Sequence, residues 1–425
     1  MKKLSILIIL ILGITLVIIP FIVGKVAEQS MYTLLDRFND EYDKYGELTL
    51  VDYKRGIRET RFNFSWKPND DNFYLSEPLA FNCIGSHGVF SFSHQCSASS
   101  IDFEGQTGGA QNPVSLLGNF SLFGEVSEII TFNQFELHQG NNDFVFFLPT
   151  TIRVNTNKSF KIFDIETESE GFKLVTQSRK IVVSNLDLVG RGTLNTIKFV
   201  IGNVSASTDS ISIESMSDEK FVFEGLTMNT ITEEDGQNIS ITTKLNAIDY
   251  VYAKSETVDL KNLDFEFKLS GLDMAQLALL NEKIGSVSGR TSSQINANYI
   301  SLIPVFQDLL KTNLSTTTTF SAEHLSDQIT LDANIKLVGD LSFGDVLMLK
   351  LNPKSVLAKM DVNYYSTIPL SLINSNPQTM NSITNNSWYM KTDVAYIANF
   401  RMIDGDAILN KRQLKTQDVL QMIGR

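Results

Sequence analysis

The sequence predicts a mainly β protein with a few helices. We expect an N-terminal transmembrane helix, then a large curved antiparallel sheet with bulged repeats, covered by a pair of helices. Three observations predict this arrangement. An uncharged apolar run opens the chain, short alternating apolar and polar segments fill its middle, and one alternating pattern recurs there with the same odd spacing.

The opening run spans Leu4 to Val23 and contains no charged residue. About 20 apolar residues are needed for one helical crossing of a ~30 Å hydrocarbon core. A signal peptide has a shorter apolar region and a small-x-small cleavage site, whereas the only small pair nearby is Gly24 and Ala27. We therefore predict an uncleaved anchor over residues 1–24, with a cleaved peptide as the alternative. Two lysines precede the run, which predicts a cytoplasmic N-terminus and a translocated body.

The composition excludes one class of partner. The formal net charge is −12 and the pI is about 4.9. An acidic surface repels phosphate backbones, and no cluster of Lys and Arg offsets it, so nucleic-acid binding is not expected.

The chain has two cysteines, Cys83 and Cys96, in a segment rich in Ser, Gly and His. In an oxidising compartment such a pair predicts a disulfide, with two unpaired thiols as the alternative. His87 and His94 lie between the cysteines, but their spacing is not that of a zinc site. We predict no metal and no cofactor.

An amphipathic helix is predicted over residues 25–46, directly after the anchor. Its apolar residues recur at helical spacing, and charged residues lie between them. They are Met31, Leu34, Leu35, Phe38 and Tyr42. We expect this face to pack on the body of the protein.

Residues 47–270 are predicted to form the antiparallel β-rich body. In four places, apolar residues occur at positions i, i+2, i+5 and i+7, with Asn, Gln or Gly at i+4. The i+4 residues are Gln134, Asn185, Gly225 and Asn262. A β-bulge absorbs the odd step of three and returns later side chains to the first face. Asn and Gly tolerate the positive φ that such a step needs.

Residues 271–312 are predicted to form the covering helical pair, from Leu272 to Ile284 and from Asn296 to Lys311. Residues 313–425 are predicted to be a C-terminal β-rich part. A hairpin should turn at Asp404-Gly405-Asp406, and a short last helix should follow Thr416, a good N-cap. No linker long enough to separate independent domains is present.

The chain has four histidines that could act as catalytic bases: His87, His94, His138 and His324. No GxSxG, HExxH or P-loop motif is present. A Ser-His-Asp arrangement assembled from distant positions stays open, but no motif points to one. We expect a protein that is not an enzyme.

Several short motifs, in order, resemble those of the YdgA-like family of Gram-negative inner-membrane proteins, whose function is unknown. They begin with Gly24-Lys25 and Glu28 and continue with Tyr53-x-Arg55-Gly56. His87-Gly88 follows, although Val89 stands where the family has Pro. Later matches are Met360 to Pro369, Gly405 and Asn410-Lys411, where the family's second Gly is lost.

The resemblance implies an inner-membrane anchor, a β-rich periplasmic body and no enzyme activity. It marks Tyr53, Arg55, Gly56, His87 and Gly88 as a motif whose role is either functional or structural. Our leading hypothesis is a non-enzymatic protein that binds a lipid or an envelope partner along an apolar face of its sheet. The alternative is an envelope scaffold with a closed core, and an envelope-acting enzyme ranks third.

Overall fold

The structure is a computed structural model. It describes residues 20, 22–33, 35–36, 39, 46–67, 78–98, 113–121, 123–139, 143–157, 159, 161–195, 199–215, 219–253, 257–285, 309, 311, 313–342, 344–345, 353–375, 383–384 and 386–423. The chain divides into two compact units, Met1–Gly192 and Thr193–Arg425. The boundary falls inside strand β11 (Arg179–Leu194), within the stretch that the sequence predicts to be one β-rich body.

The first unit contains a helix over residues 22–33 and an antiparallel sheet. Strands β1 to β6 follow one another as neighbours, and β6 then pairs with β9. β10 pairs with β9 along its first half and with β8 along its second half, and β7 pairs with β8. The strands are β1 Glu47–Arg55, β2 Glu59–Lys67, β3 Leu79–His87, β4 Ser91–Ala98, β5 Val114–Ser121, β6 Glu125–Phe132, β7 Phe135–Gln139, β8 Asp143–Phe147, β9 Thr150–Asn157 and β10 Ile162–Val175.

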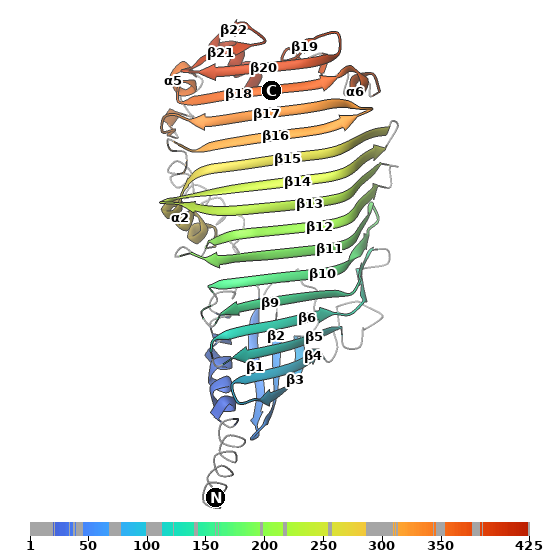
Figure 1. The fold of residues 1–425 in the computed structure, drawn as a ribbon, viewed down its shortest axis with the longest axis vertical. Coiled ribbons are helices and arrows are strands. Elements are labelled where there is room, and N and C mark those ends of the chain that lie inside the picture. Colours follow the sequence, from blue (N-terminus) through green and yellow to red (C-terminus); the bar gives the residue numbers. More distant parts are fainter. Residues whose placement is uncertain are drawn as a thin grey trace, which may run out of the picture. The chain divides into compact units, whose positions relative to one another are not determined.

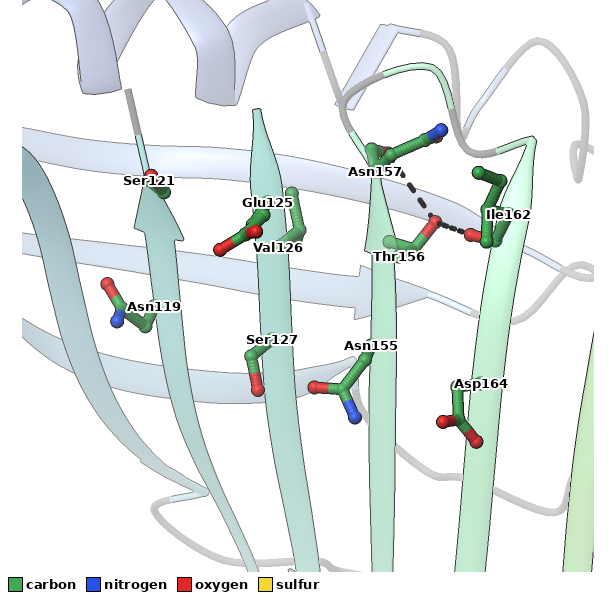
Figure 2. Close-up of a pocket in the computed structure, with 10 residues that line it drawn as sticks. All are labelled: Asn119, Ser121, Glu125, Val126, Ser127, Asn155, Thr156, Asn157, Ile162 and Asp164. Atoms are coloured by element: carbon green, nitrogen blue, oxygen red, sulfur yellow. Dashed lines mark hydrogen bonds between the residues drawn. The ribbon is translucent and has the colours of Figure 1, made fainter. Parts of the chain in front are cut away.

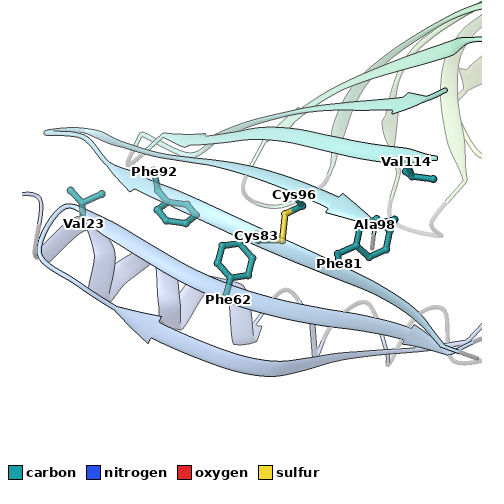
Figure 3. Packing of buried hydrophobic residues seen from close by; sticks show 8 residues of the cluster. All are labelled: Val23, Phe62, Phe81, Cys83, Phe92, Cys96, Ala98 and Val114. Atoms are coloured by element: carbon teal, nitrogen blue, oxygen red, sulfur yellow. A yellow bond between two sulfur atoms is a disulfide. The ribbon is translucent and has the colours of Figure 1, made fainter. Parts of the chain in front are cut away.

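The core of the first unit lies where the helix meets the sheet. Val23 of the helix is buried in one cluster with Phe62, Phe92 and the two cysteines, and the yellow disulfide lies among the aromatic rings (Figure 3). Ala27 and Met31, one and two turns further along the helix, also pack against this cluster. The apolar stripe of the helix therefore covers the sheet through i, i+4 and i+8 positions.

The second unit contains a ladder of long antiparallel strands that lie side by side from β12 to β18 (Figure 1). β20 then pairs with β18, β19 and β21, and β21 pairs with β22. The elements are β12 Val200–Ser215, β13 Lys220–Asp235, β14 Asn238–Ala253, β15 Thr257–Asp273, α2 Met274–Gly285, β16 Ser315–His324, β17 Asp327–Leu337, α5 Pro353–Leu357, β18 Met360–Pro369, α6 Leu370–Ser375, β19 Met390–Lys391, β20 Ala395–Ile403, β21 Asp406–Leu409, β22 Arg412–Leu414 and α8 Thr416–Ile423.

Short helices pack at the ends of these strands. Apolar residues of α2 contact a cluster around Ile239 and Leu272. Leu372 of α6 packs with Ala322 and Ile329. α5 and α8 contribute to a third cluster, which includes residues of β20 and β21. Asp404 and Gly405 have φ of 51° and 77° in the β20–β21 turn, the left-handed pair that a tight two-residue hairpin needs.

The prediction of a mainly β, antiparallel chain with few helices is confirmed. Most of the predicted anchor, from Leu4 to Val23, lies outside the described residues, and so does most of the second predicted helix, from Asn296 to Lys311. Among the residues that the structure describes, no helix has the length and apolar character to cross a membrane.

Candidate functional site

One face of the β12–β17 sheet is lined by apolar side chains. Residues directly opposite each other on neighbouring antiparallel strands point to the same side of a sheet. We call the residues of three such cross-strand rows the apolar face. The rows are Ile213–Phe221–Tyr252–Val258, Ile211–Phe223–Tyr250–Leu260 and Ala206–Met228–Leu245–Phe265–Phe320–Leu331.

The apolar side chains stay on one side of the sheet even where two of its strands contain a residue with positive φ. Gly225 and Asn262 have φ of 60° and 51°. Val258 and Leu260 precede Asn262 and Leu263 follows it, yet all three pack against the same cluster. The left-handed residue therefore absorbs the odd step in the apolar pattern, and the side chains before and after it share one face.

The other two predicted bulge positions lie in the first unit. Asn185, in β11, has φ of 51°. Gln134 differs, because it lies in the two-residue connection between β6 and β7. β6 and β7 pair with different strands, β9 and β8 respectively. The first copy of the pattern is therefore not one bent strand.

The opposite face of the same strands is polar. One row runs Ser205–Asn229–Lys244–Glu266–Thr319–Asp332 and another runs Ser210–Glu224–Asp249–Lys261–Glu323. Lys244 Nζ lies 2.9 Å from Glu266 Oε2, and the hydrogen bond to this carboxylate raises the pKa of Lys244. In these rows the sheet is therefore amphipathic, with apolar side chains on one side and charged or polar side chains on the other.

Much of the apolar face is only half covered. The ring pairs Phe221–Tyr252 and Phe223–Tyr250 have centroids 4.8 and 4.7 Å apart, and burial raises the pKa of Tyr250. The side chain of Met228 is 37% exposed. The buried clusters among the described residues do not include Met228, Leu245 or Phe265. Across β13 and β14, the face therefore presents adjacent apolar side chains that those clusters do not cover.

His87 is one of the motif residues marked by the family resemblance, and it is buried at the end of β3. Its Nδ1 lies 3.1 Å from the carbonyl oxygen of Ile57, which can only accept, so Nδ1 carries the proton. Its Nε2 lies 2.6 Å from Thr60 Oγ1 and accepts from that hydroxyl in the neutral ring. Both ring nitrogens are thus occupied, one by Ile57 of the β1–β2 turn and the other by Thr60 of β2, which leaves neither available to a substrate.

The other motif residues surround His87 where the helix docks. A Cβ on Gly24 would lie 2.2 Å from His87 Cε1, so only glycine lets the helix approach this ring. Arg55 forms an ion pair with Glu28 of the helix. The Tyr53 hydroxyl is buried, and this burial raises the pKa of Tyr53.

The two motif glycines shape turns beside this cluster. Gly56 N donates to Glu59 O over 2.7 Å, and Gly88 N donates to Ser91 O over 2.8 Å. Motif residues far apart in sequence therefore meet at one place, where they join the helix to the sheet. The arrangement fits a structural joint better than a reaction centre.

The two cysteines bond to each other, and His94 and His324 each have partners outside the motif. Cys83 and Cys96 lie directly opposite each other on β3 and β4 and form a disulfide. His94 Nε2 lies 3.0 Å from Glu128 Oε1, and His324 bonds to the Asp259 carbonyl and to Ser375. No three described His, Cys, Asp or Glu side chains are grouped so as to hold a metal ion. The side chain of His138 lies outside the described part.

A polar hollow of about 370 Å³ opens on the first unit, on strands β5, β6, β9 and β10 (Figure 2). Asn119, Ser127, Asn155 and Asp164 form one cross-strand row in it. Amide, hydroxyl and carboxylate groups line the hollow, and none of its ten lining residues is aromatic. It offers hydrogen bonds without a stacking platform, so it is a weaker candidate than the apolar face.

Thr60 and Glu128 are two partners of the histidines that no sequence motif predicts. Each is the partner of a histidine that is 27 or 34 residues away along the chain. Nothing in the local pattern marks them, because the pairing depends on strand register.

Comparison with known proteins adds a family but no activity. No curated protein and no solved structure matches this chain. A family model described as a bacterial protein of unknown function (DUF945) matches residues 1–415. The chain therefore belongs to the DUF945 family of bacterial proteins of unknown function.

Proposed function

We propose that this protein is a non-enzymatic, membrane-anchored protein of the bacterial envelope that binds lipid acyl chains along its apolar face. The observation that carries the proposal is the continuity of that face across six strands, opposite a charged face. A soluble body rarely leaves a large contiguous apolar patch without a partner. An acyl chain suits the rows because the contact needs apolar area and no directional bonds.

Three features support the envelope location. The uncharged run from Leu4 to Val23 has the length of a membrane anchor. The Cys83–Cys96 disulfide fits an oxidising compartment such as the periplasm. The resemblance to the YdgA-like family implies a Gram-negative inner membrane with the body in the periplasm. An anchored body of this kind stands beside a source of lipid.

The second candidate is an envelope scaffold whose apolar face is filled. The packing of α2 and α6 against both ends of the long strands favours it, since these helices already bury part of the sheet. An enzyme acting on envelope material ranks third, because the described histidines are engaged in structural hydrogen bonds.

A reporter assay tests the acyl-chain proposal. The full chain would be purified in a non-ionic detergent, stripped of lipid and titrated with cis-parinaric acid, whose fluorescence rises in apolar surroundings. Met228→Asp places a charge on the apolar face and should weaken binding by about tenfold or more, because burying an unpaired carboxylate is costly. Thr227→Asp, on the opposite face of the same strand, should bind normally.

Lipid analysis gives an independent readout. Mass spectrometry of an extract from the purified protein should contain stoichiometric acyl lipid, reduced in Met228→Asp. Protein without bound lipid, together with equal parinaric acid binding by both variants, would reject the acyl-chain proposal in favour of the scaffold.

A further inference from the structure

Three exposed apolar side chains lie on alternate turns, at one end of the first unit. Ile57 lies in the β1–β2 turn, Phe90 in the β3–β4 turn and Phe123 in the β5–β6 turn, with exposures of 55%, 59% and 82%. We call them the apolar rim. Large exposed aromatic side chains are uncommon on soluble surfaces, and together they mark an interaction site.

The three turns are neighbours in space. β1 to β6 form an antiparallel meander, so every second turn lies at the same end of the sheet. His87 N donates to Arg58 O over 2.8 Å, which holds the first turn against the end of β3. The rings of Phe90 and Phe123 have centroids 6.0 Å apart. The rim is therefore one patch.

The N-terminal end of the helix lies at this same end. Gly24 approaches the ring of His87, the last residue of β3, and Glu28 pairs with Arg55, the last residue of β1. Ile22, next to the buried Val23, is 52% exposed. The uncharged run that begins at Leu4 ends at this point, so a segment long enough to cross a bilayer leads directly to the rim.

We propose that the apolar rim inserts into the interfacial layer of a lipid bilayer and seats the first unit on the membrane surface. Phe side chains on short turns suit this depth, because apolar groups there reach the boundary between headgroups and acyl chains. Lys25 and Arg58 are exposed beside the rim, and cations in this position are attracted to anionic lipid headgroups. The occupant is therefore lipid, and not a protein partner.

Depth measurement in a bilayer tests this proposal on the full chain. Both native cysteines are held in the buried disulfide, so a single introduced cysteine can be labelled with the fluorophore NBD. The labelled sites would be Phe90→Cys and Phe123→Cys on the rim. Leu117→Cys and Val51→Cys serve as controls, since they are exposed apolar positions within β5 and β1. Each protein would be reconstituted into phosphatidylethanolamine–phosphatidylglycerol vesicles containing lipid with a nitroxide near the headgroup.

We expect the nitroxide lipid to remove most of the fluorescence at both rim sites and little at the controls. Circular dichroism and resistance to alkaline extraction check folding and membrane retention. Equal quenching at all four sites, or at none, would overturn the proposal. So would a rim label that is shielded from water but not quenched by lipid, since protein would then cover the rim.

Discussion

At the residue scale, the motif of the first unit is explained by one close approach. The helix touches the sheet where Gly24 faces His87, and the ring of His87 is held by Thr60 and Ile57. The side-chain hydrogen of glycine leaves room that a methyl group would fill. Gly24 and His87 are far apart in the sequence, but their close contact means that a change in one affects the packing of the other.

Gly24→Ala should destabilise the first unit by about 1–3 kcal/mol, the usual cost of forcing an extra methyl into a packed contact. Urea unfolding followed by fluorescence would measure the loss. In a His87→Ala background the added cost should largely disappear, because the clashing ring is gone. Lys25→Ala, at the neighbouring exposed position, should change little. Equal costs of Gly24→Ala in both backgrounds would show that the two residues are not coupled.

Tyr364 should make stability fall at high pH. Burial raises the pKa of Tyr364 to about 12, above the ordinary value near 10. The unfolded chain therefore loses this proton first as pH rises. The contribution of protonated Tyr364 to the free energy of unfolding is complete below pH 10 and is lost as pH rises toward 12. The urea midpoint should fall less between pH 9 and pH 11.5 in Tyr364→Phe than in the parent, whereas Tyr365→Phe should follow the parent. Identical falls in all three proteins would contradict this.

At the element scale, alternation in the sequence predicts which residues share a face. The recurring step of three predicts a β-bulge at Asn185, Gly225 and Asn262. All three residues have positive φ, but β13 keeps one register with β12 and β14 on both sides of Gly225, so no extra residue is inserted there. The same reasoning does not work at Gln134, where the chain leaves one strand and starts another. Local periodicity contains no information on where a strand stops pairing, so that difference was not visible in the pattern.

Substitution at Asn262 tests the left-handed step. Asn262→Val should cost about 1–2 kcal/mol of stability, because a β-branched residue is strained at φ of 51°. Asn262→Gly should avoid the backbone strain and lose only the hydrogen bond to Glu323. Asn246→Val, at an exposed position of β14, is the control. If Asn262→Val were as stable as Asn246→Val, the step would not depend on this conformation.

The disulfide should stabilise the β3–β4 hairpin. Joining residues 13 apart constrains the unfolded chain by about 3 kcal/mol in the loop-entropy estimate. The double variant Cys83→Ala and Cys96→Ala should therefore lower the urea midpoint of the first unit. Reducing the parent protein after denaturation should lower its refolded stability by a similar amount. An unchanged midpoint in both cases would mean that the bond adds no net stability.

At the scale of the whole molecule, the sequence predicted the class and the apolar face but not the cross-strand partners. The amphipathic strands follow from residue alternation, since apolar and polar side chains point to opposite sides. The joint around His87, the His94–Glu128 pair and the apolar rim depend on register between strands. Residues such as Phe90 and Phe123 become neighbours only once the sheet is folded.

The central claim is that the apolar face holds lipid, and photo-crosslinking from two adjacent positions tests it most directly. Met228 lies on the apolar face and Thr227 on the polar face of β13, and both are exposed. A photoreactive benzoyl-phenylalanine at each position would be irradiated in intact bacterial membranes, and adducts identified by mass spectrometry. We expect acyl-lipid adducts at position 228 and none at position 227. No lipid adduct at 228, or equal adducts at both positions, would contradict the claim.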